Sequence, residues 1–273
     1  MNKKIIKKIA VIVVPLYKPV LTRQEEFSIV NTLSVLSKWE VVFIAPFRLK
    51  SYIEELSIIP LSSEQSIFFE DKYFESVNGY NQLLMSRFFY EKFASYEFML
   101  IVQTDAIVIS DQVELWCSKN YSYIGAPWFD GMEKPIKPLN LIGVGNGGFS
   151  LRKIKDFILA LSEYRYVPNK MVKYKKKTLL NLVRYIRNNY IFSFNFNPLL
   201  PKTNEDIFWG GLMANAVPTF TVPAAAEAAL FSFETCPEYL FELTERNLPF
   251  GCHAWEKYNK EFWVDKLNLP SDL

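Results

Sequence analysis

Three continuous apolar runs, each closed by a proline or a polar residue, restrict the fold of this chain more than any other feature. The runs are "KIAVIVVP" at 8–15, "EVVFIAP" at 40–46 and "EFMLIVQ" at 97–103. Apolar residues without polar alternation are typical of strands that are buried on both faces, as in parallel sheets. Helix-like segments separate the runs. We therefore expect an α/β sandwich with a mainly parallel central sheet.

The remaining elements follow the same pattern of strands and helices. A polar helical stretch is expected from about Thr22 to Trp39, and amphipathic spacing predicts a helix over "YNQLLMSRFFYEKFASY" at 80–96. A short fourth strand is expected in "YSYIGAPW" at 121–128. Further helices are expected from about Lys153 to Tyr164 and over "NEDIFWGGLMANA" at 204–216. In sheets of this class, ligands bind beyond the carboxyl ends of the strands.

Length and composition favour one large folded domain. The chain has 273 residues, of which 50% are hydrophobic and 16% aromatic, so it can bury a sizeable core. The formal net charge of +2 gives no overall electrostatic basis for binding nucleic acid. We find no internal repeat or flexible linker. The simplest interpretation is a single domain over residues 1–273 with a basic insert at about 165–202.

Cysteine usage and apolar run lengths predict a cytoplasmic location. Cys117, Cys236 and Cys252 are widely spaced and form no CxxC pair, which favours a reducing compartment. The N-terminal apolar run is short, is closed by Pro15 and lacks a cleavage site, so we interpret it as a strand and not a signal peptide. No run approaches the roughly 20 apolar residues of a membrane helix.

The basic insert has two possible interpretations. Cations recur from Arg165 to Arg187, and no acid occurs between Arg165 and Asn204. Such a charge run is usually a solvated face. Apolar residues such as Leu179 and Val183 are interleaved with the cations, however, and this pattern also suits attachment to anionic lipid. The second interpretation predicts a peripheral contact with the inner membrane face.

Asp105 and His253 are the first candidates for chemistry. Asp105 closes the buried run "LIVQTD", where it is either a solvated strand end or a ligand to a metal. His253 is the only histidine and lies in a turn after "FGC", where it is either a packed turn residue or a ligand.

A glycine cluster and an acid pair are the other candidates. Four glycines in "GVGNGGFS" at 143–150 form either a tight turn or a loop that approaches a ligand closely. Glu205 and Asp206 open a predicted helix, where acids commonly serve as caps. Trp128 and Phe129 are candidates for a sugar platform or for core packing.

The order of these motifs resembles that of the GT-A glycosyltransferases. More closely, the chain is similar to a family of uncharacterised GT-A-like proteins. The resemblance rests on "VPLYKP", "GYNQLLMSRFFYEKF", "LIVQTDAIVIS", "YIGAPW", "VGNGGFSLR", "EDIFW" and "PFGCHAW", which together span Pro15 to Trp255. It implies a GT-A (Rossmann-like) fold and the transfer of a sugar from a nucleotide sugar.

The resemblance also implies roles for individual residues. "QTD" takes the place of the DxD motif, so Asp105 and His253 would bind Mn²⁺ or Mg²⁺, while Gln103 adds no negative charge. Asp206 would be the catalytic base of an inverting reaction, and Glu205 would hold a hydroxyl. The expected donor-binding residues are Pro15, Leu16, Tyr17, Asn81, Arg87, Gln103, Thr104, Asp105, Gly147 and Gly148. Among them Tyr17 would stack on the base, and Arg87 is alternatively a paired residue on its helix.

We therefore expect a metal-assisted glycosyltransferase, with UDP among the candidate nucleotides and a glycan or lipid-linked glycan as acceptor. Its process would be the synthesis of a bacterial surface polysaccharide, and nucleic acid is not an expected partner. A non-catalytic carbohydrate- or nucleotide-binding protein on the same fold is the alternative, favoured by Gln103. A nucleotidyltransferase would need a glycine-rich loop after the first strand, and "PLYKPVLT" has no glycine.

Overall fold

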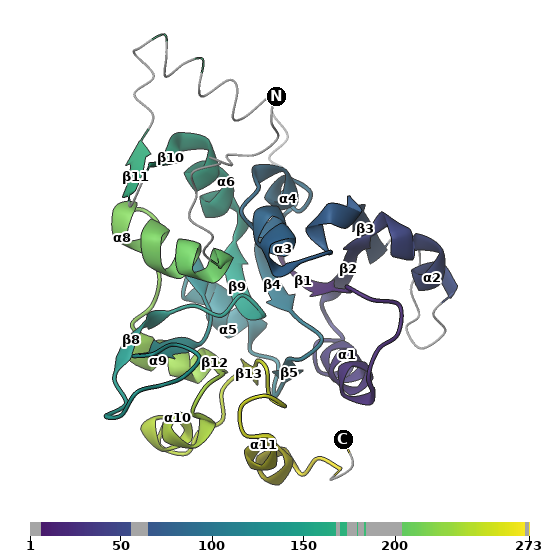
Figure 1. The fold of residues 1–273 in the computed structure, drawn as a ribbon, viewed down its shortest axis with the longest axis vertical. Coiled ribbons are helices and arrows are strands. Elements are labelled where there is room, and N and C mark those ends of the chain that lie inside the picture. The colour runs from purple at the N-terminus through teal and green to yellow at the C-terminus, as the bar shows by residue number, and fades with distance from the viewer. Residues whose placement is uncertain are drawn as a thin grey trace.

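The computed structural model describes residues 7–55, 65–167, 170–173, 179, 183, 204–270 and 273. Its central sheet has six strands in the order β3-β2-β1-β4-β9-β6. These are β1 (Lys8–Pro15), β2 (Glu40–Pro46), β3 (Ser66–Phe69), β4 (Tyr96–Val102), β6 (Tyr123–Ile124) and β9 (Phe149–Lys153). All of these strands except β6 are labelled in Figure 1. Strands β1 to β4 pair in parallel, and β9 runs antiparallel to both of its neighbours. The expected mainly parallel α/β architecture is confirmed.

Both faces of the sheet are buried, as the continuous apolar runs predict. In β1, Val11 and Val13 enter one hydrophobic core, whereas Ile12 and Val14 enter a second core on the opposite face. Successive side chains of a strand point to opposite faces, so a strand covered on both sides needs apolar residues at every position. The two cores therefore define the layers of an α/β/α sandwich.

Helices and turns cover the two faces. The first core receives α3 (Val77–Leu84), α4 (Arg87–Glu91), α6 (Ile154–Glu163) and the π-helix Ile207–Met213, which continues into α8 (Ala214–Ala216). The second core receives α1 (Arg23–Val35), α2 (Lys50–Glu55) and α5 (Val113–Ser118). Short 3₁₀ turns at Phe47–Leu49 and Asp71–Tyr73 join the strands to these helices.

A smaller sheet lies beyond the carboxyl end of β4. It contains β12 (Ser232–Phe233), β13 (Gly251–Cys252) and β5 (Ile107–Val108), with β13 in the middle. A third core packs around it and includes residues of α9 (Ala225–Phe231), α10 (Pro237–Leu243) and α11 (Lys260–Leu267), which gather at the lower end of Figure 1. Two hairpins complete the structure, β7 (Pro127–Phe129) with β8 (Leu141–Val144) and β10 (Tyr164–Val167) with β11 (Lys170–Lys173).

The helix expected over 80–96 is instead two short helices. Helix α3 ends at Leu84, and α4 begins at Arg87. The carbonyl of Leu84 accepts hydrogen bonds from the Tyr90 hydroxyl at 2.6 Å and from the Trp209 indole at 3.2 Å. Because side chains occupy this acceptor, the helix is interrupted after Leu84. By contrast, the helix expected from Thr22 is confirmed over Arg23–Val35, and Thr22 and Glu25 form its capping box.

Most of the basic insert lies outside the described residues. The prediction of a lipid-binding surface from Arg165 to Arg187 therefore stays a prediction. Every helix in the described part of the chain falls short of the length and apolar character that a membrane crossing requires.

Candidate active site

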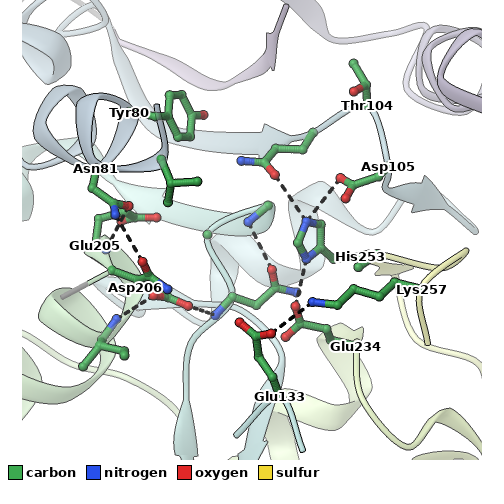
Figure 2. A pocket seen from close by; sticks show the side chains of 18 of the residues that line it. Tyr80, Asn81, Thr104, Asp105, Glu133, Glu205, Asp206, Glu234, His253 and Lys257 are labelled. Atoms are coloured by element: carbon green, nitrogen blue, oxygen red, sulfur yellow. Dashed lines mark hydrogen bonds and ion pairs between the residues drawn. The ribbon is translucent and has the colours of Figure 1, made fainter. Parts of the chain in front are cut away.

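The small sheet brings together side chains that are far apart in the sequence. Cys252 of β13 pairs with Ile107 of β5 and with Phe233 of β12. Asp105 lies two residues before Ile107, Glu234 directly follows Phe233, and His253 directly follows Cys252. All three side chains therefore reach a cleft of about 690 Å³ at the carboxyl end of β4 (Figure 2).

His253 is bound on both sides of its ring. Its Nε2 lies 3.2 Å from Oδ1 of Asp105 and 3.3 Å from Oε1 of Gln103. Its Nδ1 lies 3.0 Å from Oε1 of Glu234. Burial lowers the pKa of His253, but the carboxylates of Asp105 and Glu234 outweigh it and raise the pKa to about 10. Burial likewise raises the pKa of Asp105, and the imidazolium more than offsets it, so that pKa is lowered overall.

The glycines at 147 and 148 allow two functional side chains to approach the backbone. A Cβ atom at Gly148 would overlap the ring of His253, and one at Gly147 would overlap the carboxylate of Glu205. The amide of Gln103 donates to the Gly148 carbonyl at 2.8 Å, which ties this loop to the end of β4. The glycine cluster is thus a site of close approach and not only a turn.

Glu205 forms a buried ion pair with Arg152. Nη2 of Arg152 lies 2.7 Å from Oε1 of Glu205, and the two side chains are 0% and 4% exposed. Arg152 also donates to the Tyr90 hydroxyl at 3.0 Å and to Oγ of Ser150 at 3.1 Å. Burial raises the pKa of Glu205 to about 7, and the guanidinium opposes this rise. Glu205 is therefore held in place, and its raised pKa means that it binds a proton more tightly than an ordinary glutamate does.

Asp206 lines the same cleft beside Glu205 (Figure 2). Its Oδ1 accepts the amide of Ile207 at 2.8 Å, and its Oδ2 accepts the amide of Asn146 at 3.1 Å. Burial raises the pKa of Asp206, and these two hydrogen bonds lower it only in part. Asn81 fixes the preceding backbone, because its Oδ1 accepts the Glu205 amide at 3.2 Å.

Several predicted donor-binding residues line the cleft, and others do not. The lining includes Tyr17, Asn81, Gln103, Thr104, Asp105, Gly147 and Gly148. Pro15 and Leu16 are buried in the sandwich and are absent from the lining, so their predicted contact with the donor stays a prediction. Arg87 is absent from it too, because its guanidinium pairs with Glu91 of the same helix at 2.7 Å.

Of the two aromatic candidates, one lines the cleft and the other does not. Trp128 lines the cleft and lies against Gly145, where any Cβ would overlap the indole. Phe129 is 0% exposed and packs edge-on against Tyr239, 5.7 Å away. Adjacent residues of β7 point to opposite sides, so only Trp128 faces the cleft. Phe129 lies in the third core, which fits the core-packing alternative for this residue.

Sequence reasoning missed Arg152 and Glu234. Glu234 ends the apolar run "LFSF", just as Asp105 ends its own run, and that similarity was an available signal. Arg152 is a charged residue within a strand that is otherwise buried, which also predicts an ion partner. Neither signal identifies the partner, because the partners lie in other segments of the chain.

Acidic side chains dominate the charge of the cleft. Among the described residues that line it, the acids are Glu25, Glu75, Asp105, Glu133, Glu205, Asp206 and Glu234, and the bases are Lys257 and His253. Lys257 is itself paired with Glu133 at 3.1 Å. This lining disfavours a bare phosphate group and favours a ligand that arrives with a cation.

The fold and this cleft define an α/β protein with an acid-lined cleft at the carboxyl edge of its sheet. Residues 64–253 match the family model described as "Protein of unknown function (DUF5672)". The match covers more than half of the chain, which therefore belongs to this family. No curated protein matches the chain.

Three solved structures are similar to this chain in the course of their backbones. One is a glycosyltransferase involved in the glycosylation of the major capsid of PBCV-1, with 11% identity, 96% of this chain and 100% of that chain covered, and a TM-score of 0.40. An active-site mutant of LgtC has 12% identity, 96% and 98% coverage, and a TM-score of 0.48. Apo mouse xyloside xylosyltransferase 1 has 11% identity, 91% and 97% coverage, and a TM-score of 0.45. At these identities the likeness concerns the fold alone.

Proposed function

We propose that the protein is a glycosyltransferase that moves a sugar from a nucleoside-diphosphate sugar to a hydroxyl acceptor. One observation carries the proposal: a single cleft contains the Asp105–His253 pair and the adjacent carboxylates of Glu205 and Asp206. The first pair suits a cation that accompanies the diphosphate. The second supplies carboxylates that can accept a proton. Metal-assisted, inverting glycosyl transfer uses both.

The residues around Nε2 of His253 fit Mn²⁺ or Mg²⁺. Nε2 lies 3.2 Å from Oδ1 of Asp105 and 3.3 Å from Oε1 of Gln103. Two ligands of one octahedral ion are separated by roughly 3 Å when each bond is near 2.1 Å. Carboxylate and carbonyl oxygens such as those of Asp105 and Gln103 suit both ions. A bound cation would offset the charge that develops on the leaving diphosphate.

The donor set is incomplete without substrate. In the described part of the chain, no group of three or more histidine, cysteine or acidic side chains is arranged to hold a metal ion. Glu234 does not complete such a group, because it binds Nδ1, on the other side of the ring. A site with one carboxylate commonly completes its coordination with substrate phosphates. We therefore expect the cation and the nucleotide to bind together.

Asp206 is the proposed base. Its position in the cleft allows a carboxylate oxygen to accept the proton of the acceptor hydroxyl. The hydroxyl oxygen forms its bond to the anomeric carbon while the bond from that carbon to the diphosphate breaks. Attack opposite the leaving group inverts the anomeric configuration. Arg152 fixes Glu205, which lines the cleft and is the proposed acceptor for a sugar hydroxyl; its Oε2 is buried and has no hydrogen-bond partner among the described residues.

Release of nucleoside diphosphate from a panel of UDP- and GDP-sugars, with Mn²⁺ and with candidate acceptors, tests this proposal. Asp206→Asn should lower turnover by roughly 10²–10⁴-fold, because it removes the base. It should leave nucleotide affinity nearly unchanged. Asp265→Asn is the matched control, because Asp265 is exposed and pairs with Lys266 away from the cleft lining. Equal turnover in Asp206→Asn and the wild type would contradict the proposal.

A second candidate is a non-catalytic binding protein with the same cleft. Gln103 favours it, because an amide near Nε2 attracts a cation less strongly than a carboxylate does. This candidate predicts that nucleotide binds but that no donor in the panel is turned over. It also predicts that Asp206→Asn and Asp265→Asn behave alike.

A further inference from the structure

We propose that Glu234 is a positioning residue that orients His253 for cation binding. The inference rests on the cation in the proposed function and assigns a role to a residue outside the predicted site. The carboxylate of Glu234 lies 3.0 Å from Nδ1 of His253, and Nε2 of the same ring faces Asp105 and Gln103. Glu234 acts through the ring and does not touch the cation.

Backbone pairing fixes the relative position of Glu234 and His253. Phe233 of β12 and Cys252 of β13 are partners in a parallel pair, so the two functional residues follow adjacent strand ends. The His253 amide donates to the Phe233 carbonyl at 3.0 Å, which continues the pairing into the site. The contact between the side chains is therefore set by the small sheet and does not depend on a flexible loop.

The ring of His253 has little room to turn. One side lies against Gly148, where a Cβ would overlap the ring atoms. The imidazole is 15% exposed and the carboxylate of Glu234 is 20% exposed. When Nδ1–H donates to Glu234, the lone pair of Nε2 is directed to the side of Asp105. A carboxylate that accepts this hydrogen bond also makes the imidazole a stronger ligand.

The sharpest test compares Mn²⁺ affinity in variants of two acids from the same cleft. Affinity is measured by electron paramagnetic resonance and calorimetry, with and without a nucleoside diphosphate. Glu234→Ala removes the acceptor, and Glu234→Gln keeps an oxygen that can accept from Nδ1–H but removes the charge. Glu133→Gln removes the same charge from the cleft, where Glu133 pairs with Lys257 and not with His253. Thermal unfolding of each variant confirms that it is folded.

We expect Glu234→Ala to raise the dissociation constant for Mn²⁺ by roughly 10- to 100-fold, as outer-sphere partners of ligating histidines do. Glu133→Gln should change it by less than about fivefold, because an exposed charge is screened by water. Glu234→Gln should lie between these two. The inference is overturned if Glu234→Ala binds Mn²⁺ as the wild type does while His253→Ala does not.

A second readout reports the contact itself. His253 is the only histidine, so its ring nitrogens give one set of nuclear magnetic resonance signals. In the Mg²⁺-loaded protein we expect a Nδ1–H proton that is protected from exchange, and Glu234→Ala should remove the protection. An Nδ1–H proton that exchanges without protection in the wild type would overturn the inference about Glu234 but not the proposed function. Absence of any cation binding by the wild type would overturn both the inference and the metal-assisted form of the proposed function.

Discussion

The two ends of the cleft contain ion pairs of similar chemistry in different surroundings. Arg152 and Glu205 are 2.7 Å apart and almost fully buried. The guanidinium also lies over the ring of Tyr123, 5.6 Å from its centroid. His253 and Asp105 are 3.2 Å apart, and the Asp105 side chain is 45% exposed. One pair is thus enclosed by protein, and the other is open to the cleft.

This difference indicates different roles. A buried pair cannot lose one partner without leaving an uncompensated charge, so it fixes the position of Glu205. In the proposed function the open pair would exchange the proton on Nε2 for a cation, because the Asp105 side chain is exposed to the cleft. The first end is therefore suited to holding a hydroxyl in place, and the second to binding a charged ligand.

The largest expected effect breaks the buried pair. Arg152→Ala should lower the free energy of unfolding by about 3–5 kcal/mol, because it leaves the Glu205 carboxylate buried without its cation. Arg246→Ala is the matched control, since Arg246 pairs with Glu242 on the surface and such a pair contributes about 0–1 kcal/mol. Denaturant unfolding measures both. Equal losses in the two variants would contradict the contrast between the buried and exposed pairs.

A smaller effect is expected from crowding the open end. Gly148→Ala should destabilise the fold by about 1–3 kcal/mol, because the added methyl overlaps the His253 ring. It should also weaken Mn²⁺ binding. Gly211→Ala has open space around its Cβ and should be neutral or stabilising by up to about 1 kcal/mol. If both variants unfold and bind Mn²⁺ alike, Gly148 does not position the ring.

The smallest expected effect is a shift in pH dependence. The base must be ionised, so turnover should fall as the pH is lowered through the pKa values of the Glu205–Asp206 pair. Burial raises the pKa values of both carboxyl groups, and it raises the pKa of Glu205 to about 7. The acid limb of kcat should therefore lie between about 4, where an ordinary aspartate titrates, and about 7. A rate that stays constant from pH 7 down to 4 would contradict this prediction.

Sequence patterns predicted the sandwich well because the apolar residues of a strand themselves indicate which of its faces are buried. The run at 9–15 is apolar at every position, and β1 is buried on both faces from Ala10 onward. The break after Leu84 was not predictable in the same way. It depends on the Leu84 carbonyl accepting from Trp209, which lies 125 residues further along the chain.

The site was predicted in part, for a similar reason. The motif order suggested that Asp105 and His253 meet, and the structure places them 3.2 Å apart. Arg152 and Glu234 were missed because their importance depends on partners in other segments. Phe129 was assigned by its neighbour Trp128, although adjacent strand residues face opposite sides. The metal-binding role of Asp105 and His253 and the catalytic role of Asp206 are the predictions that the experiments test.

The most direct test of the account is anomalous diffraction at the manganese edge from crystals grown with Mn²⁺ and a nucleoside diphosphate. We predict an anomalous peak within bonding distance of Oδ1 of Asp105 and Nε2 of His253, with phosphate oxygens of the nucleotide completing the coordination. Nucleotide bound in the cleft with no manganese at these two atoms, or manganese bound elsewhere, would contradict it.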